Sequence, residues 1–593
     1  MTRLFLRHIF PAAALLLFAF LKSGFTQTDS LNPSGAERNA LWDTFSDTWA
    51  AVDDLGRPVA EHNLTGDARA GKFVGVFYYI WHGQHTTQLY DITKILAEDP
   101  LNPNWGPEHV FHHWSEPLYG YYLSDDEWVI RKNAQMLADA GVDVIFFDVT
   151  NAVPYTRIYL TLCQIYRDIR NQGGRTPQIA FLTNSSSGQT VQSIYENLYA
   201  KGIYKELWFH WKGKPIILAK EEELTDEQRE FFTIRRSWAW QPGQDKWPWL
   251  EHYPQQGGWR DNPDQIEQMV VETAQHPLNH NDGLGLGKSF HDGVQPPPGQ
   301  YQSEKGLCFN EQWRRALEVD PEFIFITQWN EWIAMRFLTD KPMKLAGKDL
   351  NPGDSYFVDL YSMEFNRDIE PMKGGYKDNY YYQMVDGVRR FKGVRNLPKA
   401  SSPRTIPLNH FEAWKDVQPE YRDDVGDVFP RHHPGYGDLF YRNTTGRNDF
   451  KVMKVARDDE FLYFYAQTVL PISPKIGTNW MMLFLQIGNP EPTCWEGWRY
   501  LVQPVSSERD SPLALKKYQA GNWKTIGFLN YDCDGREMAI RIPREMLEIR
   551  AGCTDLDLRF KWSDNMQEFD PLDWIVNGDA APNGRFQYRY QSN

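Results

Sequence analysis

The sequence predicts an α/β domain followed by an all-β domain, and two patterns along its 593 residues support this division. From Lys72 onward, short apolar runs alternate with stretches of helical periodicity, which is the pattern of strand–helix–strand units in a parallel sheet. Beyond residue 409 the helical signals nearly vanish, and alternating apolar and polar residues form runs at regular spacing, as in a β-sandwich. A chain of this length is also too long for one ordinary domain.

The α/β part begins with a strand at 72–81, "KFVGVFYYIW". A helix is expected at 125–141, where acidic residues open the segment, apolar residues recur every three to four positions, and Gly141 ends it. The next strand is "VDVIFFD", 142–148. The series continues with helices at "YTRIYLTLCQIYRDIRNQG" and "TVQSIYENLYAKG", and with strands at "QIAFLTN", "KPIILA", "FTIRRSWAW", "IEQMVVETAQH" and "EFIFITQWNEW".

Seven strands precede Trp332, and "SYFVDLY" at 355–361, followed by a helix at "YYYQMVDGVRRF", supplies an eighth. Eight such units predict a TIM (β/α)8 barrel. The rival fold is a doubly wound open sheet, which usually carries a glycine-rich phosphate loop after its first strand. The sequence there is "YYIWHGQH", which is no such loop. We expect the barrel at 28–395, a proline- and serine-containing linker at 396–409, and a β-sandwich of jelly-roll or immunoglobulin-like size at 410–593.

The N-terminus predicts a signal peptide at 1–27. Arg3 and Arg7 precede an apolar stretch at 9–21 that is too short to span a bilayer comfortably, and small residues follow it. An uncleaved anchor is the alternative. The signal peptide predicts a secreted or periplasmic protein. No later segment is long and apolar enough to cross a membrane.

The composition favours a carbohydrate as the partner. The net charge is −15, so the electrostatic footprint of a nucleic-acid binder is absent. Aromatic residues make up 15% of the chain, and their flat faces stack on the apolar faces of sugar rings, although β-rich proteins carry many aromatics in any case. The five cysteines form no C-x-x-C pair, so a zinc site is not expected. The oligomeric state is not indicated.

The active site of a TIM barrel lies where the strands end, so the residues that follow each apolar run are the candidates. Hydrolysis of a glycosidic bond needs two carboxyl groups, and we select Glu331 and Asp148 as the catalytic pair. Glu331 sits between two tryptophans, where desolvation would raise its pKa as a general acid requires. The substrate-binding candidates are Tyr78, Trp81, His82, Trp114, Glu116, Asn151, Asn184, Trp240, Glu251, His276, Trp329, Asn330 and Trp332. No metal ligands are assigned to this site.

Three motifs in this order resemble glycoside hydrolases of families 99 and 71: "GVFYYIWHG", "WVIRKNAQMLADAGVDVIFFDVTN" and "QWNEW". The resemblance covers roughly 72–336. It implies a TIM barrel related to endo-acting α-mannosidases, whose N-E-W-H-E segment supplies two catalytic glutamates. Asn330, Glu331 and Trp332 match that segment, but Ile333 and Ala334 follow them. Glu331 therefore carries over by motif, while the second glutamate does not.

The C-terminal half is similar to a family 9 carbohydrate-binding module. The similarity lies in "NDFKVMKVARDDEFLYFYAQT" and "WMMLFLQIGNPEPTCWEGWRYLV". It implies sugar binding by Trp495, Trp498 and Tyr500, and a structural Ca²⁺ in this domain.

Taken together, these features predict a secreted glycoside hydrolase that cleaves a polysaccharide or glycan with a carboxylate pair and needs no cofactor for the reaction. Two other functions stay open. One is a non-catalytic carbohydrate-binding protein on a barrel scaffold. The other is a polysaccharide lyase, in which tyrosine and histidine would act as acid and base.

Overall fold

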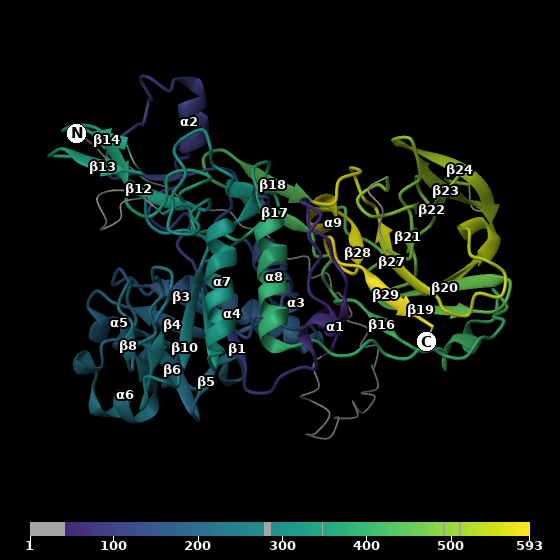
Figure 1. Cartoon of the computed structure of the whole chain (residues 1–593), viewed down its shortest axis with the longest axis horizontal. Helices are drawn as coiled ribbons and strands as arrows, with labels where there is room; N and C mark the ends of the chain where they lie inside the picture. The colour runs from purple at the N-terminus through teal and green to yellow at the C-terminus, as the bar shows by residue number, and fades with distance from the viewer. Residues whose placement is uncertain (1–41, 278–285, 347, 490–492, 509–510, 593) are drawn as a thin grey trace, which may run out of the picture. The chain divides into compact units, whose positions relative to one another are not determined.

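The structure is a computed structural model of the chain, and it describes residues 42–277, 286–346, 348–489, 493–508 and 511–592 (Figure 1). The described residues belong to one compact unit. The predicted signal peptide lies outside the described residues. Among the helices of the described ranges, none has the length and apolar character needed to cross a bilayer.

A curled, mostly parallel sheet forms the centre of the α/β part. Its order is β5-β6-β4-β3-β1-β11-β10-β9-β8, and β7 pairs with β6. β1 pairs in parallel with β3 on one edge and with β11 on the other. The strands are β1 (Phe73–Tyr78), β3 (Val144–Val149), β4 (Gln178–Thr183), β5 (His210–Trp211), β6 (Lys214–Leu218), β7 (Thr233–Arg235), β8 (Gly243–Gln244), β9 (Gly258–Trp259), β10 (Gln268–Glu272) and β11 (Phe323–Thr327).

The described residues show this curled sheet and not a complete ring of eight parallel strands. Between β7 and β10 the wall consists of the two-residue strands β8 and β9, and β9 runs antiparallel to β10. An isolated parallel bridge between Arg236 and Lys246 connects the β7 side to the β8 side.

The predicted eighth strand at 355–361 is wrong. Only Ser355–Phe357 (β15) is a strand, and it pairs antiparallel with β12 (Ile333–Leu338) in a separate sheet that also contains β2 (Phe111–His113). The physical reason is that β11 already occupies the free edge of β1, so the sheet has no place there for another strand.

Aromatic rings fill the interior of the curled sheet. Phe146 packs on Phe325 with ring centroids 5.1 Å apart, and Trp247 stacks on Phe323 at 4.5 Å. Gly75 on β1 makes room for them, because a Cβ atom there would come within 2.6 Å of the Phe323 ring and 2.8 Å of the Phe146 ring. The interior is therefore a packed core, and ligands have access only at the ends of the strands.

Helices cover the sheet at the places that the sequence predicts. α3, α4, α5 and α8 confirm the helices expected at 125–141, 155–173, 190–202 and "YYYQMVDGVRRF". α3 begins after Asp126, whose carboxylate accepts the backbone N–H of Trp128 at 3.1 Å. The helices are α1 (His62–Thr65), α2 (Ile92–Glu98), α3 (Glu127–Asp139), α4 (Thr156–Asn171), α5 (Ser187–Ile194), α6 (Asp226–Phe231), α7 (Leu307–Val319), α8 (Asn379–Lys392) and α9 (Asp573–Val576).

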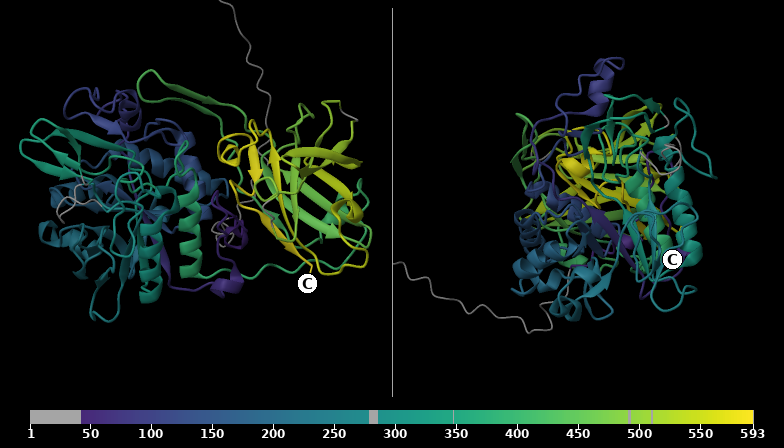
Figure 2. Two further views of the ribbon diagram at one scale, coloured as in Figure 1. Left: turned by 45° about the horizontal axis from the view of Figure 1, so that its top comes forward. Right: turned by 90° about the vertical axis from the view of Figure 1, so that its left-hand side faces the viewer.

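Beyond α8 the described chain consists mainly of antiparallel strands (Figure 2). A five-stranded sheet contains β16 (Tyr421–Arg422), β19 (Phe450–Arg457), β20 (Phe461–Thr468), β25 (Tyr531–Asp534) and β26 (Glu537–Pro543). A seven-stranded sheet contains β21 (Met482–Ile487), β22 (Tyr500–Pro504), β23 (Leu513–Gln519), β24 (Asn522–Leu529), β27 (Asp557–Asp564), β28 (Asp579–Ala581) and β29 (Tyr588–Gln591). Two small hairpins are β13 (Met343–Leu345) with β14 (Lys348–Leu350), which precede α8, and β17 (Arg431–Pro434) with β18 (Phe440–Asn443), which follow it.

The two larger sheets pack face to face. Phe464 of β20 contacts Phe560 of β27 at a centroid distance of 5.9 Å, and Phe450 contacts Trp562 at 6.2 Å. The strands expected at regular spacing after residue 409 are therefore present, and their inward aromatic residues form a sandwich core.

Candidate active site

Residues from three strands meet at the carboxyl end of the curled sheet. Along β1, side chains alternate between the two faces, so Tyr79 follows the inward-facing Phe77, and their rings lie 5.0 Å apart. Asp148 lies near the end of β3, and Glu331 follows β11. Burial, together with the nearby Glu331 and Asp148 carboxylates, raises the pKa of the Tyr79 hydroxyl. The two carboxyl groups selected from the sequence therefore lie around one tyrosine.

Glu331 is held by three neighbouring residues. Gln328 donates its side-chain amide to Glu331 Oε2 at 2.7 Å, and Arg367 forms an ion pair with the same oxygen. The backbone N–H of Glu331 donates to Asp368 at 2.5 Å. Burial raises the pKa of Glu331; Arg367 opposes this shift, and the Asp359 and Asp368 carboxylates reinforce it. Because both side-chain contacts go to Oε2, Oε1 is the oxygen left to carry a proton or meet a ligand.

Arg367 connects Glu331 to a neighbouring loop. Its guanidinium is fully buried and donates to the backbone carbonyl of Asp359 at 2.7 Å, and it lies 3.2 Å from His276 Nδ1. His276 is in turn 3.5 Å from the Asp359 carboxylate, whose side chain is 38% exposed. Asp359 is therefore the acidic residue of this group that solvent reaches most easily.

Asp148 is fixed by its own turn and by Trp81. The backbone N–H of Thr150 donates to Asp148 Oδ1 at 3.0 Å, and the indole N–H of Trp81 donates to Oδ2 at 3.2 Å. Burial raises the pKa of Asp148, and the Asp359 carboxylate adds to this effect. Asp148 and Glu331 are both nearly inaccessible to solvent, at 5% and 4% exposure, so most of each carboxyl group is covered by neighbouring residues.

The residues beside the glutamate on "QWNEW" have structural contacts. Asn330 accepts the backbone N–H of Tyr79 at 2.9 Å and donates to the Tyr79 carbonyl at 3.3 Å. Trp332 stacks on Trp114 with centroids 5.2 Å apart, and both rings are fully buried, as is Trp329. These side chains attach the segment after β11 to β1 and to the core, and in this structure they offer no face to a sugar.

Four of the other candidates divide into two groups. His276 and Trp240 belong to the carboxylate cluster, because their rings lie 5.5 Å apart and His276 contacts Arg367. Tyr78 and His82 lie elsewhere in the core. The Tyr78 hydroxyl contacts a helix α3 side chain at 3.4 Å, and burial lowers the pKa of His82 to about 3, which keeps it neutral.

Four candidates lie away from the carboxylate pair or at its edge. Glu116 pairs with two lysines at 2.5 and 3.0 Å. Burial is the largest single effect on its pKa and raises it, but the two lysines together outweigh burial and lower the pKa. Glu251 accepts two backbone N–H groups of its own loop, and burial raises its pKa to about 7. Asn151 is exposed and Asn184 is half-buried, on the turns after β3 and β4.

Sequence reasoning missed the segment 359–370, which supplies the partners of the glutamate. Beside Asp359 and Arg367, it contributes Asp368, which accepts the indole N–H of Trp114 at 2.7 Å, and Glu370, whose pKa burial raises to about 8. The available signal was the concentration of charged residues in "VDLYSMEFNRDIEP", just before a predicted helix. The predicted strand at 355–361 concealed it.

The aromatic residues named for the C-terminal part are only partly accessible. Trp498 and Tyr500 are buried, at 1% exposure each. Trp495 is half-buried and packs against Phe484 at 5.7 Å and Phe569 at 5.5 Å. Phe569 is 44% exposed. Trp495 and Phe569 therefore form the accessible edge of this aromatic cluster.

Comparisons with known proteins give a distant likeness only. No family model matches the chain, and no curated protein matches it. The GH99 endo-α-mannosidase from Bacteroides thetaiotaomicron is 14% identical with a TM-score of 0.32, and the match covers 55% of this chain and 98% of that one. A second structure of the Bacteroides thetaiotaomicron enzyme, in complex with bis-tris-propane, is 13% identical with a TM-score of 0.30. That match covers 54% of this chain and 97% of the other. At these values the likeness says nothing about the reaction or the substrate.

Proposed function

We propose that this protein is a glycoside hydrolase that cleaves glycosidic bonds in a polysaccharide or glycan. The observation that carries the proposal is that two buried carboxyl groups stand at the carboxyl end of the curled sheet, Asp148 near the end of β3 and Glu331 after β11, which are the two strands that flank β1. Glycoside hydrolysis requires one carboxyl group that protonates the leaving oxygen and a second that serves as nucleophile or base.

Glu331 suits the role of general acid/base. Arg367 and Gln328 both donate to Oε2, so the proton would sit on Oε1, and burial raises the pKa of the group in the direction that a general acid requires. Asp148 is the partner. Asp148 accepts two N–H groups, and these hydrogen bonds favour its ionised form, which a nucleophile or base requires.

The wider assignment follows from the sequence. We propose that the chain acts outside the cytoplasm after removal of 1–27, that turnover needs no cofactor, and that the α/β part at 28–395 holds the active site. The segment 410–593, joined by the linker 396–409, would bind carbohydrate through the accessible edge formed by Trp495 and Phe569. The curled sheet would act as the barrel of the predicted fold.

The direct test is hydrolysis of a broad panel of polysaccharides by the secreted protein, with reducing-sugar release as the readout. Glu331→Gln and Asp148→Asn should each lower turnover by roughly 10²- to 10⁴-fold, because each removes a proton-transfer or nucleophilic group. Glu116→Gln is the matched control, since this carboxylate pairs with surface lysines, and it should keep wild-type turnover. Calorimetry should show that Glu331→Gln still binds the substrate.

A non-catalytic carbohydrate-binding protein is the second candidate, and Ala334 favours it. Ala334 is buried on β12 opposite His112, where the resembling family has its second glutamate. Tight binding of one glycan with no product from any glycan would establish this alternative and contradict hydrolysis. A product that absorbs in the near ultraviolet would instead identify a lyase.

A further inference from the structure

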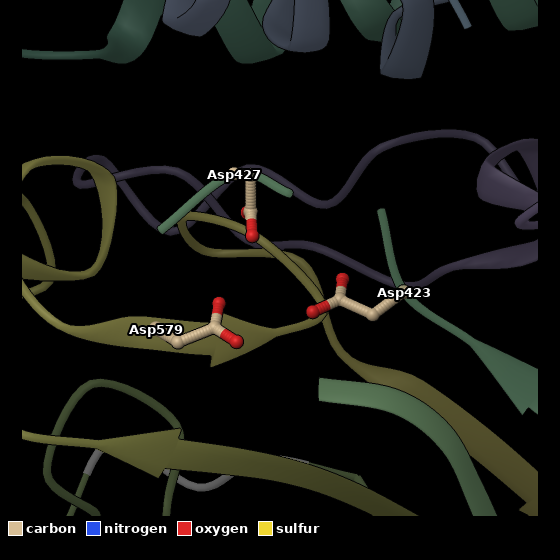
Figure 3. A group of neighbouring side chains, drawn as sticks. All are labelled: Asp423, Asp427 and Asp579. Atoms are coloured by element: carbon tan, nitrogen blue, oxygen red, sulfur yellow. The ribbon is translucent and has the colours of Figure 1, made fainter. Parts of the chain in front are cut away.

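Three aspartates far from the candidate active site point their carboxylates toward one another (Figure 3). Asp423 and Asp427 lie between β16 and β17, and Asp579 begins β28. One oxygen from each lies within 4.8 Å of the others. Like charges at this separation repel one another strongly inside a protein, so their arrangement requires a compensating group.

Among the described residues, the Asp423 carboxylate has no hydrogen-bond or ion-pair partner. Its side chain is 0% exposed, and neither Oδ1 nor Oδ2 has a hydrogen-bond partner. Asp427 is satisfied at one oxygen only. Its Oδ1 is buried without a partner, while its Oδ2 accepts the side-chain amide of Gln135 at 2.7 Å. Burying a carboxylate with both oxygens unpaired is costly, and native proteins rarely leave such groups unsatisfied.

The nearby positive charge acts on the cluster only across space. Lys561 is buried close enough to attract Asp423 and Asp579, but its ammonium group donates to the backbone carbonyl of Pro582. A further acidic residue, Asp449, lies close by; its Oδ2 accepts the backbone N–H of Gly426 at 2.8 Å, and its Oδ1 has no partner. The surroundings add negative charge, and no described cationic side chain forms an ion pair with the three aspartates.

We propose that Asp423, Asp427 and Asp579 bind one Ca²⁺ ion. Carboxylate oxygens are the ligands that hard divalent cations prefer, and the cluster offers neither sulfur nor imidazole. Three carboxylates leave room for the carbonyl and water ligands that complete the six to eight positions of Ca²⁺.

The ion would fasten three elements together. Asp579 is anchored to β19, because its Oδ2 accepts the backbone N–H of Phe450 at 2.7 Å. Asp427 is anchored to helix α3 of the α/β part through Gln135. The segment 423–427 therefore reaches both the sandwich and α3, and a cation on its aspartates would stabilise this connection.

The experiment measures Ca²⁺ content and thermal stability of the full chain. After EDTA treatment and dialysis, equilibrium titration with Ca²⁺ should show one ion bound at this site per chain, and saturating Ca²⁺ should raise the Tm by roughly 3–8 °C. Asp423→Asn should abolish both effects. In EDTA this variant should be at least as stable as the wild type, because it removes one repelling charge. Asp555→Asn is the control, since Asp555 is an exposed aspartate of the same part of the chain.

Each result decides the proposal. A wild type that retains no Ca²⁺ and shows no Ca²⁺-dependent change in Tm overturns it without reference to any variant. A response to Mg²⁺ with none to Ca²⁺ overturns the choice of ion. Ca²⁺ binding that survives unchanged in Asp423→Asn and in Asp579→Asn places the ion elsewhere and overturns the site.

Discussion

The Arg367–Glu331 pair gives a test of the state of the candidate acid, because a second buried pair provides a comparison. Arg367 is 0% and Glu331 4% exposed in their side chains. Arg235 and Glu267 are equally buried, at 2% and 5%, with contacts of 2.7 and 2.8 Å. The pKa of Glu331 is raised by burial, whereas the pKa of Glu267 is lowered, because Arg235 and two tryptophan N–H groups outweigh the effect of burial.

Replacing each arginine by methionine should therefore give different pH dependences. In Arg235→Met, Glu267 loses its charged partner and keeps only two tryptophan N–H donors, which costs about 3–5 kcal/mol wherever Glu267 stays ionised. At pH values below the raised folded pKa of Glu331, the Arg367→Met variant leaves a protonated Glu331, so only hydrogen bonds are lost, at about 1 kcal/mol each. As pH rises through this raised pKa, Glu331 ionises. Arg367 stabilises the carboxylate in the wild type and is missing in the variant, so the cost of the substitution grows toward about 3–5 kcal/mol.

Urea unfolding of both variants and the wild type at a series of pH values from about 5 to 9 measures these differences. The expected result is a loss of unfolding free energy that is small at low pH and grows with pH for Arg367→Met, and that is already present at low pH for Arg235→Met. Equal losses for both variants at every pH would show that Glu331 is ionised throughout this range. That result would refute its assignment as a general acid by the argument from burial.

Three further outcomes are expected. Gly75→Ala should lower the free energy of unfolding by about 1–3 kcal/mol in a denaturant titration, since its Cβ meets Phe323 and Phe146; unchanged stability would contradict the packed interior. The folded pKa of Glu370 is raised to about 8, so wild-type stability should fall as pH rises from about 4.5 to 8. Glu370→Gln should remove this part of the fall, and an unaltered pH profile would argue against the raised pKa. Trp495→Ala should weaken glycan binding in affinity electrophoresis without changing hydrolysis of a soluble substrate, and unchanged retention would exclude this aromatic edge as a sugar site.

Local pattern was sufficient to predict most elements. The helix α3 was foreseeable because acidic residues, 3–4 periodicity and a terminal glycine all lie within one segment. β1, β3 and β11 were foreseeable from their apolar runs, and Asp148 and Glu331 from their positions at the strand ends. These features depend on neighbours in the chain, which the sequence shows directly.

Features that depend on distant contacts were not foreseeable in the same way. The segment 355–361 has the composition of a strand, yet β11 occupies the edge of β1 that an eighth strand would need. Asn330 was selected as a hydroxyl-binding residue, but its amide pairs with the backbone of Tyr79, 251 positions earlier. No local pattern reveals which strand edge is free or which backbone group an amide will meet.

The sequence by itself therefore determined the alternation of strands and helices, the change to an all-β part, and the two acidic residues at the strand ends. Only the tertiary structure decided that Arg367 pairs with Glu331, that Trp329 and Trp332 belong to the core, and that Asp423 lies buried without a partner. The physical reason is that periodicity and strand-end position are local properties of the chain. Burial and charge pairing are set by residues far apart in sequence, and they exist only once the chain has folded.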